Sequence, residues 1–137
     1  MDKALNYLSL ARKGGKAELG EEPVGAITRA GKGYLVLVAS DASDHTWRRA
    51  KSFVAGTEQQ CLRLRATKEE LGQAIGRTSL AIAAVTDPAL ALALVQALDE
   101  PEKNKAALEV LKEKTEKMKK RQSEAKAHKR NVRMGKK

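Results

Sequence analysis

Aromatic side chains are scarce in this chain, which has only Tyr7, Tyr34, Trp47 and Phe53. The core must therefore be aliphatic, built from Leu, Val, Ile and Ala. A single cysteine, Cys61, excludes an internal disulfide and fits a reducing compartment. The sequence also lacks a run near the ~18 apolar residues of a membrane-spanning helix, and its start lacks the roughly 7–15-residue apolar run of a signal peptide. We expect a cytoplasmic protein that does not contact a membrane.

Acidic residues are the minority, 17 Asp and Glu against 27 Lys and Arg, so the 137-residue chain has a formal charge of +10. Residues 1–98 hold 13 basic and 10 acidic residues, whereas residues 99–137 hold 14 and 7. Residues 117–137 alone have ten basic side chains and one acid, Glu124. Such a segment binds polyanions by releasing their counterions, without needing a fold. We predict a nearly balanced domain, residues 1–98, and a highly basic C-terminal extension, residues 99–137; a merely solubilising tail is the alternative.

Apolar residues alternate between helix and strand periods along residues 1–98. Continuous apolar runs at residues 34–39 and 79–85 predict buried strands, and residues 17–19 and 61–64 predict two shorter ones. Helical spacing predicts helices between and after them. Thr67 and Glu70 have the spacing of a capping box, and Asp87 followed by Pro88 is a typical helix start. The alternation predicts an α/β fold, in which helices cover both faces of a sheet of about four strands.

The basic extension has a weaker pattern. Beyond Pro101, residues 102–127 favour helix, but their apolar stripe is thin. Thr115 and Gln122 fall in the register of that stripe and are polar. We therefore predict a helical or disordered, solvated extension and not a coiled coil.

Two carboxylates suggest an enzyme as one hypothesis. Asp41 and Asp87 each follow a well-defined strand, and ligands of open α/β sheets bind beyond the carboxyl ends of strands. The pair could hold magnesium for phosphoryl chemistry. However, Asp before a helix is a preferred N-cap, the sequence has no Gly-rich phosphate loop, and neither His45 nor Cys61 has an evident partner. We predict no catalytic residues, no metal and no cofactor.

Two longer stretches carry a family resemblance. Residues 10–43 read LARKGGKAELGEEPVGAITRAGKGYLVLVASDAS, and residues 67–87 read TKEELGQAIGRTSLAIAAVTD. Together they resemble bacterial members of the kink-turn RNA-binding ribosomal-protein superfamily, which includes L-seven-Ae and L-thirty-e. The resemblance spans roughly residues 5–98. It implies a three-layer α/β/α sandwich with a mixed sheet and no catalysis. It also implies RNA held between the start of the second helix and the loop after the fourth.

The kink-turn signature of that superfamily is only partly present. It consists of a Gly, an Asn or Lys two residues later, then Glu or Gln, and a Lys three residues further on. Gly20 matches the first position, whereas Glu22, Pro23 and Ala26 occupy the others. The kink-turn signature is therefore weakened in this chain. The acids Glu21 and Glu22 would stabilise the helix through its macrodipole, or accept hydrogen bonds from a guanine.

We predict a non-catalytic RNA-binding protein, associated with the ribosome or another structured RNA, that contacts mostly phosphate. Ribosomal or translation proteins are further predicted partners. A protein-interaction module on the same fold is the alternative, because kink-turn residues are missing. The candidate RNA-binding residues are the glycines and charged residues near the second helix and the fourth-helix loop, and cations of the extension: Lys13, Lys16, Gly20, Glu21, Glu22, Arg29, Lys32, Gly72, Ile75, Gly76, Arg77, Lys119, Lys120, Arg121, Lys129 and Arg130.

Overall fold

The computed structural model describes the backbone of residues 2–135 and the side chains of residues 2–126. The elements in this part of the chain are, in order, α1 (Asp2–Lys13), β1 (Ala17–Leu19), α2 (Glu21–Arg29), β2 (Leu35–Val38), α3 (Asp44–Val54), β3 (Gln60–Arg63), α4 (Lys68–Ala74), β4 (Ile82–Val85), α5 (Pro88–Ala97) and α6 (Lys105–Gly135). The predicted alternation of helices and strands is confirmed, as is the capping box of Thr67 and Glu70.

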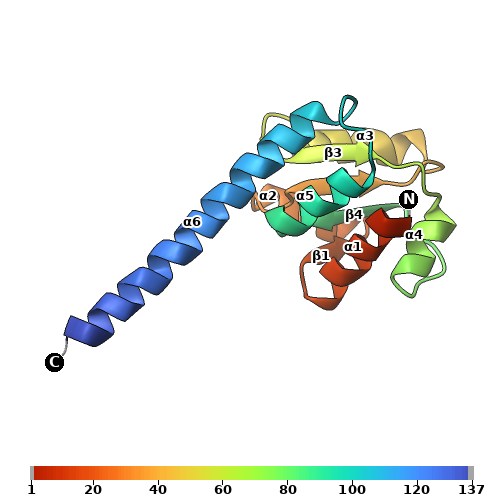
Figure 1. Cartoon of the computed structure of the whole chain (residues 1–137). Helices are drawn as coiled ribbons and strands as arrows, with labels where there is room; N and C mark the ends of the chain where they lie inside the picture. The colour runs from red at the N-terminus through yellow and green to blue at the C-terminus, as the bar shows by residue number, and fades with distance from the viewer. Residues whose placement is uncertain (1, 136–137) are drawn as a thin grey trace.

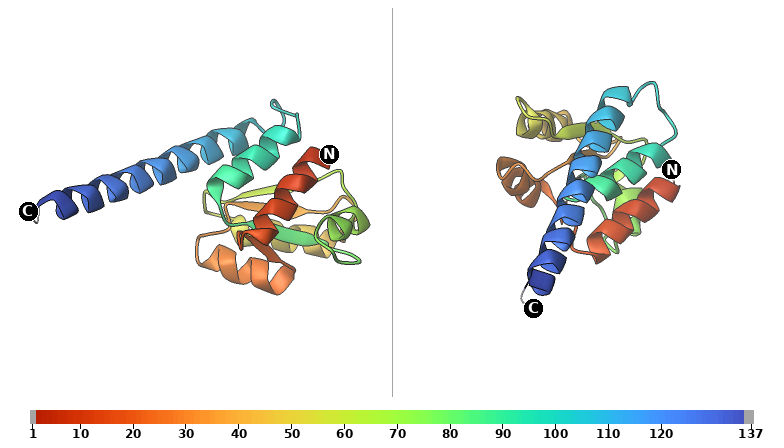
Figure 2. Two further views of the ribbon diagram at one scale, coloured as in Figure 1. Left: turned by 60° about the horizontal axis from the view of Figure 1, so that its bottom comes forward. Right: turned by 60° about the vertical axis from the view of Figure 1, so that its left-hand side comes forward.

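The strands form one mixed sheet in the order β1-β4-β2-β3. Strands β2 and β3 are parallel, whereas β4 is antiparallel to both of its neighbours, β1 and β2. Every residue of the central strands β2 and β4 is buried, because helices cover both faces: α1 and α5 lie on one side and α2 and α3 on the other (Figures 1 and 2). The molecule is therefore the expected three-layer α/β/α sandwich with an aliphatic core.

The pairing register places the loops at two opposite ends of the strands, which we call the two edges of the sheet. At one edge, Gly20 N donates to Ile82 O (3.0 Å) and Ala39 N donates to Ala81 O (2.9 Å). This end of the strands, which we call the α2-start edge, comprises residues 20–23, 39–43, 66–68, 72 and 75–81. At the other edge, Thr86 N donates to the carbonyl of Lys16 (2.8 Å). We call it the α2-end edge; it comprises residues 12–16, 29–34, 57–60 and 86–87.

The magnesium hypothesis does not fit this topology. Because β2 and β4 are antiparallel, their carboxyl ends, and with them Asp41 and Asp87, lie at opposite edges. Asp41 Oδ1 accepts a hydrogen bond from Lys68 N (2.8 Å) at the start of α4, and Asp87 Oδ2 accepts one from Leu90 N (2.9 Å) in α5. Asp87 is thus the N-cap of α5, whereas Asp41 accepts the first N–H of α4, whose N-cap is Thr67. The helix that follows Asp41 in the chain, α3, is capped by Ser43.

Helix α6 is packed at its beginning and exposed further on. Ala107, Leu111 and Thr115 are buried, and their four-residue spacing places them on one face. Thr115 is buried although it is polar, because its hydroxyl donates to the carbonyl of Leu111 (2.7 Å). Residues 119–126 are all exposed, and the far end of α6 projects from the sandwich (Figure 1). The extension is thus helical, while its separation from the domain at residue 98 stays a prediction.

None of the helices in the described residues combines the length with the apolar composition that a bilayer crossing requires. Likewise, no cluster of three or more His, Cys, Asp and Glu side chains within the described residues is arranged to hold a metal ion.

Candidate nucleic-acid interface

The start of α2 presents carboxylates held in place by the fold. Gly20 precedes the helix with φ 96° and ψ 161°, a conformation that is essentially restricted to glycine. The carboxylate of Glu21 lies 2.7 Å (Oε1 to Nε) from Arg49 of α3, so the ion pair joins the two helices. Glu22 and Pro23 are exposed. This helix start therefore offers an ion-paired acid and a solvated acid to any ligand.

The α4–β4 loop lies beside the start of α2, as the family resemblance implies. Gly72 is buried, and a Cβ at this position would be 2.6 Å from the backbone nitrogen of Ser79 and 2.8 Å from the carbonyl oxygen of Arg77. Ile75 is only 3% exposed and belongs to the core. Gly76 has φ 75° and is exposed, like Arg77. Of these predicted contact residues, Gly72 and Ile75 shape the loop, and only Gly76 and Arg77 are accessible.

The structure divides the predicted RNA-binding residues into groups. Gly20, Glu21, Glu22, Gly72, Ile75, Gly76 and Arg77 lie at the α2-start edge, whereas Lys13, Lys16, Arg29 and Lys32 lie at the α2-end edge. The lysines Lys13 and Lys16 precede α2 closely in the chain, but β1 crosses the sheet between them and the helix start. Lys119, Lys120 and Arg121 are exposed on α6, and the side chains of Lys129 and Arg130 lie outside the described residues.

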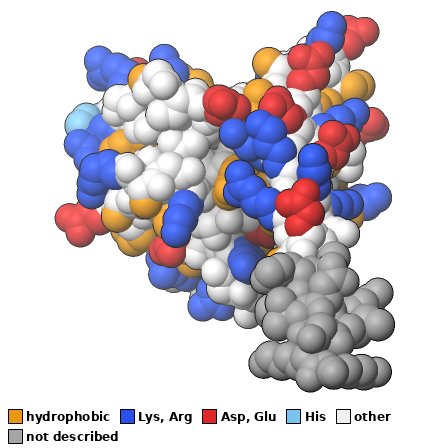
Figure 3. All heavy atoms as spheres, turned by 90° about the vertical axis from the view of Figure 1, so that its left-hand side faces the viewer, with side chains coloured by type: hydrophobic (Ala, Val, Ile, Leu, Met, Phe, Trp, Pro, Cys, Tyr) orange, Lys and Arg blue, Asp and Glu red, His pale blue; other side chains and the backbone are white. Residues whose placement is uncertain are grey.

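A cleft of about 520 Å³ separates the α2-end edge from α6. Figure 3 looks onto this side of the molecule, where Lys and Arg side chains, with some acids among them, flank the hollow. The domain contributes one wall and one face of α6 the other. We call this feature the α6 cleft, and its lining residues are Thr28, Arg29, Gly31, Tyr34, Thr57, Glu58, Gln59, Val110, Leu111, Lys114, Lys117, Met118, Arg121 and Gln122.

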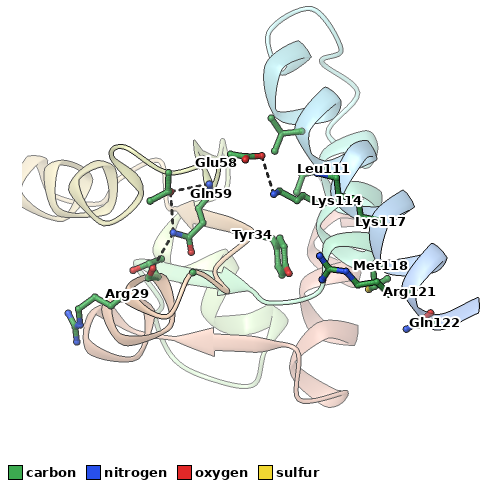
Figure 4. Close-up of a pocket in the computed structure, with 14 residues that line it drawn as sticks. Arg29, Tyr34, Glu58, Gln59, Leu111, Lys114, Lys117, Met118, Arg121 and Gln122 are labelled. Atoms are coloured by element: carbon green, nitrogen blue, oxygen red, sulfur yellow. Dashed lines mark hydrogen bonds and ion pairs between the residues drawn. The ribbon is translucent and has the colours of Figure 1, made fainter. Parts of the chain in front are cut away.

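The domain wall of the α6 cleft is built around Gln59. This buried side chain accepts a hydrogen bond from Gly33 N at Oε1 (2.8 Å) and donates from Nε2 to the carbonyl of Thr28 (3.1 Å). It thereby fixes the turn between α2 and β2, from which Tyr34 projects. In Figure 4, the guanidinium of Arg121 extends from α6 toward the ring of Tyr34 on the opposite wall. The cleft thus combines an aromatic ring with a facing cation.

The charges of the α6 cleft are unequally neutralised. Lys114 Nζ lies 3.1 Å from Glu58 Oε2, which ties α6 to the loop before β3. Lys117 Nζ lies 2.9 Å from Glu113 Oε1. Hydrogen bonding and charge attraction in this pair lower the pKa of the Glu113 carboxyl and raise that of the Lys117 ammonium. Arg121 has no ion pair among the side chains of residues 2–126.

Groups suited to nucleophilic chemistry are poorly activated. Burial in β3 raises the pKa of the Cys61 thiol to about 11, with a smaller opposing effect from Lys51. The thiol is therefore protonated near neutral pH. His45 is exposed near the start of α3, and the two candidate carboxylates, Asp41 and Asp87, each accept a helix N–H, at opposite edges.

Comparison with known proteins identifies relatives for much of the chain. No protein-family model matches it. It is 37% identical to the RNA-binding protein YlxQ of Enterococcus faecium over 75 residues, which cover 55% of this chain and 72% of that protein. A protein of unknown function from Bacillus halodurans C has a similar structure, with a TM-score of 0.67 and 28% identity over 72% of this chain and 98% of that one. For the Giardia lamblia 15.5kD RNA binding protein, the TM-score is 0.60 and the identity 17%, over 73% and 85% of the two chains.

These findings define the class of the protein. The mixed four-stranded sheet between two helical layers is an α/β domain of the L-seven-Ae type, to which the sequence motifs pointed. The identity and coverage are decisive for the family: the chain belongs to the family of the RNA-binding protein YlxQ. Kink-turn recognition and association with the ribosome stay predictions.

The sequence interpretation missed the α6 cleft. The lining residues of α6 recur at helical spacing, from Val110 through Lys114 and Lys117 to Arg121, so their common face could have been found. The opposite wall could not, because it depends on where α6 returns to the domain. Tyr34 was assigned only to the start of a strand.

Proposed function

We propose that this chain is an RNA-binding protein that binds ribosomal or other structured RNA mainly through its phosphates. The observation that carries the proposal is the relationship to YlxQ, a protein named for RNA binding. The charge distribution supports it, since ten of the last 21 residues, 117–137, are basic. Lys13, Lys16, Arg29 and Lys32 are also exposed along the α2-end edge. Association with ribosomal or translation proteins is part of the same proposal.

The domain and the extension have different tasks in this proposal. The rigid sandwich recognises the shape of the RNA, and the exposed part of α6 supplies affinity that does not depend on sequence. A helix rises about 1.5 Å per residue, so residues 119–135 extend roughly 25 Å. Cations distributed along that length can follow a phosphate backbone and release its counterions.

The proposal does not include recognition of a kink-turn through the residues of the family signature. Pro23 and Ala26 cannot replace the acceptor and the lysine of the signature, and the carboxylate of Glu22 repels phosphate. Glu21 is held by Arg49 (2.7 Å) and so is already engaged within the fold. Contacts to the phosphate backbone of the RNA, which position a protein without reading the bases, fit these residues better.

Salt dependence tests the proposed function. If six to ten phosphates are engaged, affinity for a ribosomal RNA fragment should fall about 10³–10⁵-fold between 50 and 200 mM salt. A chain that ends at Glu116 keeps the buried residues Ala107, Leu111 and Thr115 of α6 but loses the ten basic residues beyond them. It should fold and lose most of the salt slope. Absence of binding in dilute buffer, or binding that salt does not weaken, would contradict the proposal.

A protein-interaction module is the second candidate. The exposed Pro23 at the α2-start edge and the exposed Ala26 further along α2 favour it, because these side chains offer apolar contact where the family signature has polar groups. Partners that stay bound to the immobilised chain after RNase treatment would support this candidate, whereas partners released by RNase would support RNA binding.

A further inference from the structure

We propose that the α6 cleft binds an unpaired segment of RNA, with one base stacked on Tyr34 and a neighbouring phosphate bound by Arg121. This inference rests on the proposed function and adds a specific site to it. The site lies at the edge of the sheet opposite to the one that the family resemblance implies, and one of its two walls is α6.

The aromatic rings of the chain differ in how they are covered. Cations of the protein itself lie over the rings of Trp47 and Phe53, with distances of 5.3–5.6 Å to the ring centres. No such cation lies over Tyr34 among the side chains of residues 2–126. Tyr34 is half-buried and lines the cleft. A base can therefore stack on this ring without displacing a partner that the ring already has.

The cations of the cleft also differ in whether the protein itself supplies them with a partner. Lys114 and Lys117 are each paired with a carboxylate, at 3.1 and 2.9 Å. Within residues 2–126, no ion pair involves Arg29 or Arg121. A guanidinium can bind a phosphate through two parallel hydrogen bonds. Figure 4 shows the guanidinium of Arg121 extending from α6 toward Tyr34, whereas that of Arg29 points away from the cleft, so a strand that stacks a base on Tyr34 meets Arg121 beside it.

The shape of the cleft favours unpaired RNA over a duplex. Its volume of about 520 Å³ lies within the ~300–1,000 Å³ range of small-molecule sites, which suits one base with its sugar. A base reaches Tyr34 only if it leaves its stack, which loops, bulges and single strands allow. A basic groove with an aromatic ring is the usual arrangement for single-stranded nucleic acid, whereas the bases of an A-form helix are stacked inside.

A single-stranded RNA oligonucleotide that contains 2-aminopurine tests the proposal, because stacking quenches the fluorescence of this base. The full-length protein should bind the oligonucleotide at low salt and quench it. Tyr34→Leu should weaken binding about tenfold and abolish the quenching. Tyr34→Phe keeps the ring and should retain both.

The contribution of charge is tested on α6 with matched variants. Arg121→Gln should weaken binding about fivefold or more. Lys112→Gln removes the same charge from another face of the helix, on which Lys112 is exposed, and should weaken binding no more than about twofold. Thermal unfolding verifies that each variant is folded. If Tyr34→Leu does not fold, the comparison of Arg121→Gln with Lys112→Gln still tests whether the α6 cleft binds RNA.

Three results would overturn the α6 cleft as a binding site. The first is a Tyr34→Leu protein that binds and quenches like the wild type. The second is an equal loss of affinity in Arg121→Gln and Lys112→Gln. The third is a wild-type chain that binds structured RNA but not the oligonucleotide, in which case the proposed function would stand. If the wild type bound neither RNA, both proposals would fail.

Discussion

The two edges of the sheet, joined by the single helix α2, use their polar groups differently. At the α2-start edge, polar groups serve the fold itself: Asp41 accepts the first N–H of α4, Ser43 caps α3, and Glu21 pairs with Arg49. At the α2-end edge, Gln59 satisfies the backbone, and exposed cations remain around it. The capacity of an edge to bind a polyanion thus depends on which charged groups the fold leaves unengaged.

This contrast separates fold from site. The relationship to YlxQ and the L-seven-Ae type of fold direct attention to the start of α2, where relatives of that superfamily are expected to hold RNA. The residues of this chain direct it to the other edge and to α6. A fold hosts sites at several places, so the site must be argued from the side chains present.

The largest effect is expected from Gly72→Ala, which tests whether the α2-start edge is structural. The new Cβ would be 2.6 Å from the backbone nitrogen of Ser79, so the α4–β4 loop must move. We expect a loss of about 2–3 kcal/mol in the free energy of unfolding, measured by urea denaturation. In the control, Gly14→Ala, the nearest atom is 3.5 Å from the Cβ, and the change should stay within about 0.5 kcal/mol. If Gly72→Ala lowered the free energy of unfolding no more than Gly14→Ala does, the loop would tolerate a side chain and the prediction would be wrong.

The next effect is expected at the two aspartates that accept a helix N–H, one at each edge. Asp41→Ala and Asp87→Ala should each lower the free energy of unfolding by about 1 kcal/mol, because each removes the acceptor for a helix N–H. The double variant should lose the sum within about 0.5 kcal/mol, since the sites share no partner. Magnesium should not change this additivity. A magnesium-dependent rise in the melting temperature that only the wild type shows would restore the idea of a joint site.

Much of the fold could be predicted because its signals are local. The buried runs of β2 and β4, the capping box at Thr67 and the proline after Asp87 each depend on a few neighbouring residues. The aliphatic core followed from composition. The direction of β4 relative to β2 has no such local signal, and it decides that Asp41 and Asp87 lie apart.

The site was less predictable for related reasons. Lys13 and Lys16 are close to the start of α2 in sequence, yet β1 carries the chain across the sheet before the helix begins. Thr115 was read as a polar interruption of the α6 stripe, but its hydroxyl is satisfied by the carbonyl of Leu111 (2.7 Å), so the residue is buried. The place where α6 meets the domain depends on long-range packing, and therefore the α6 cleft had no sequence signal on its domain side.

The smallest effect comes from neutralising one carboxylate at each edge. Glu58→Gln removes the partner of Lys114 (3.1 Å) and leaves an additional uncompensated cation at the α6 cleft. Exposed ion pairs are worth about 0–1 kcal/mol, so affinity for unpaired RNA should rise roughly two- to fivefold at low salt. Glu22→Gln removes one negative charge at the α2-start edge and should change affinity less than about twofold.

Both variants can be measured by 2-aminopurine fluorescence in the same buffer, with thermal unfolding as a test of the fold. The charge change is identical, so a difference between them reports the position of the RNA and not the net charge of the protein. A larger gain from Glu22→Gln would mean that phosphates approach the start of α2. The contrast between the edges would then be reversed, and the binding mode implied by the family resemblance would apply to this chain despite Pro23 and Ala26.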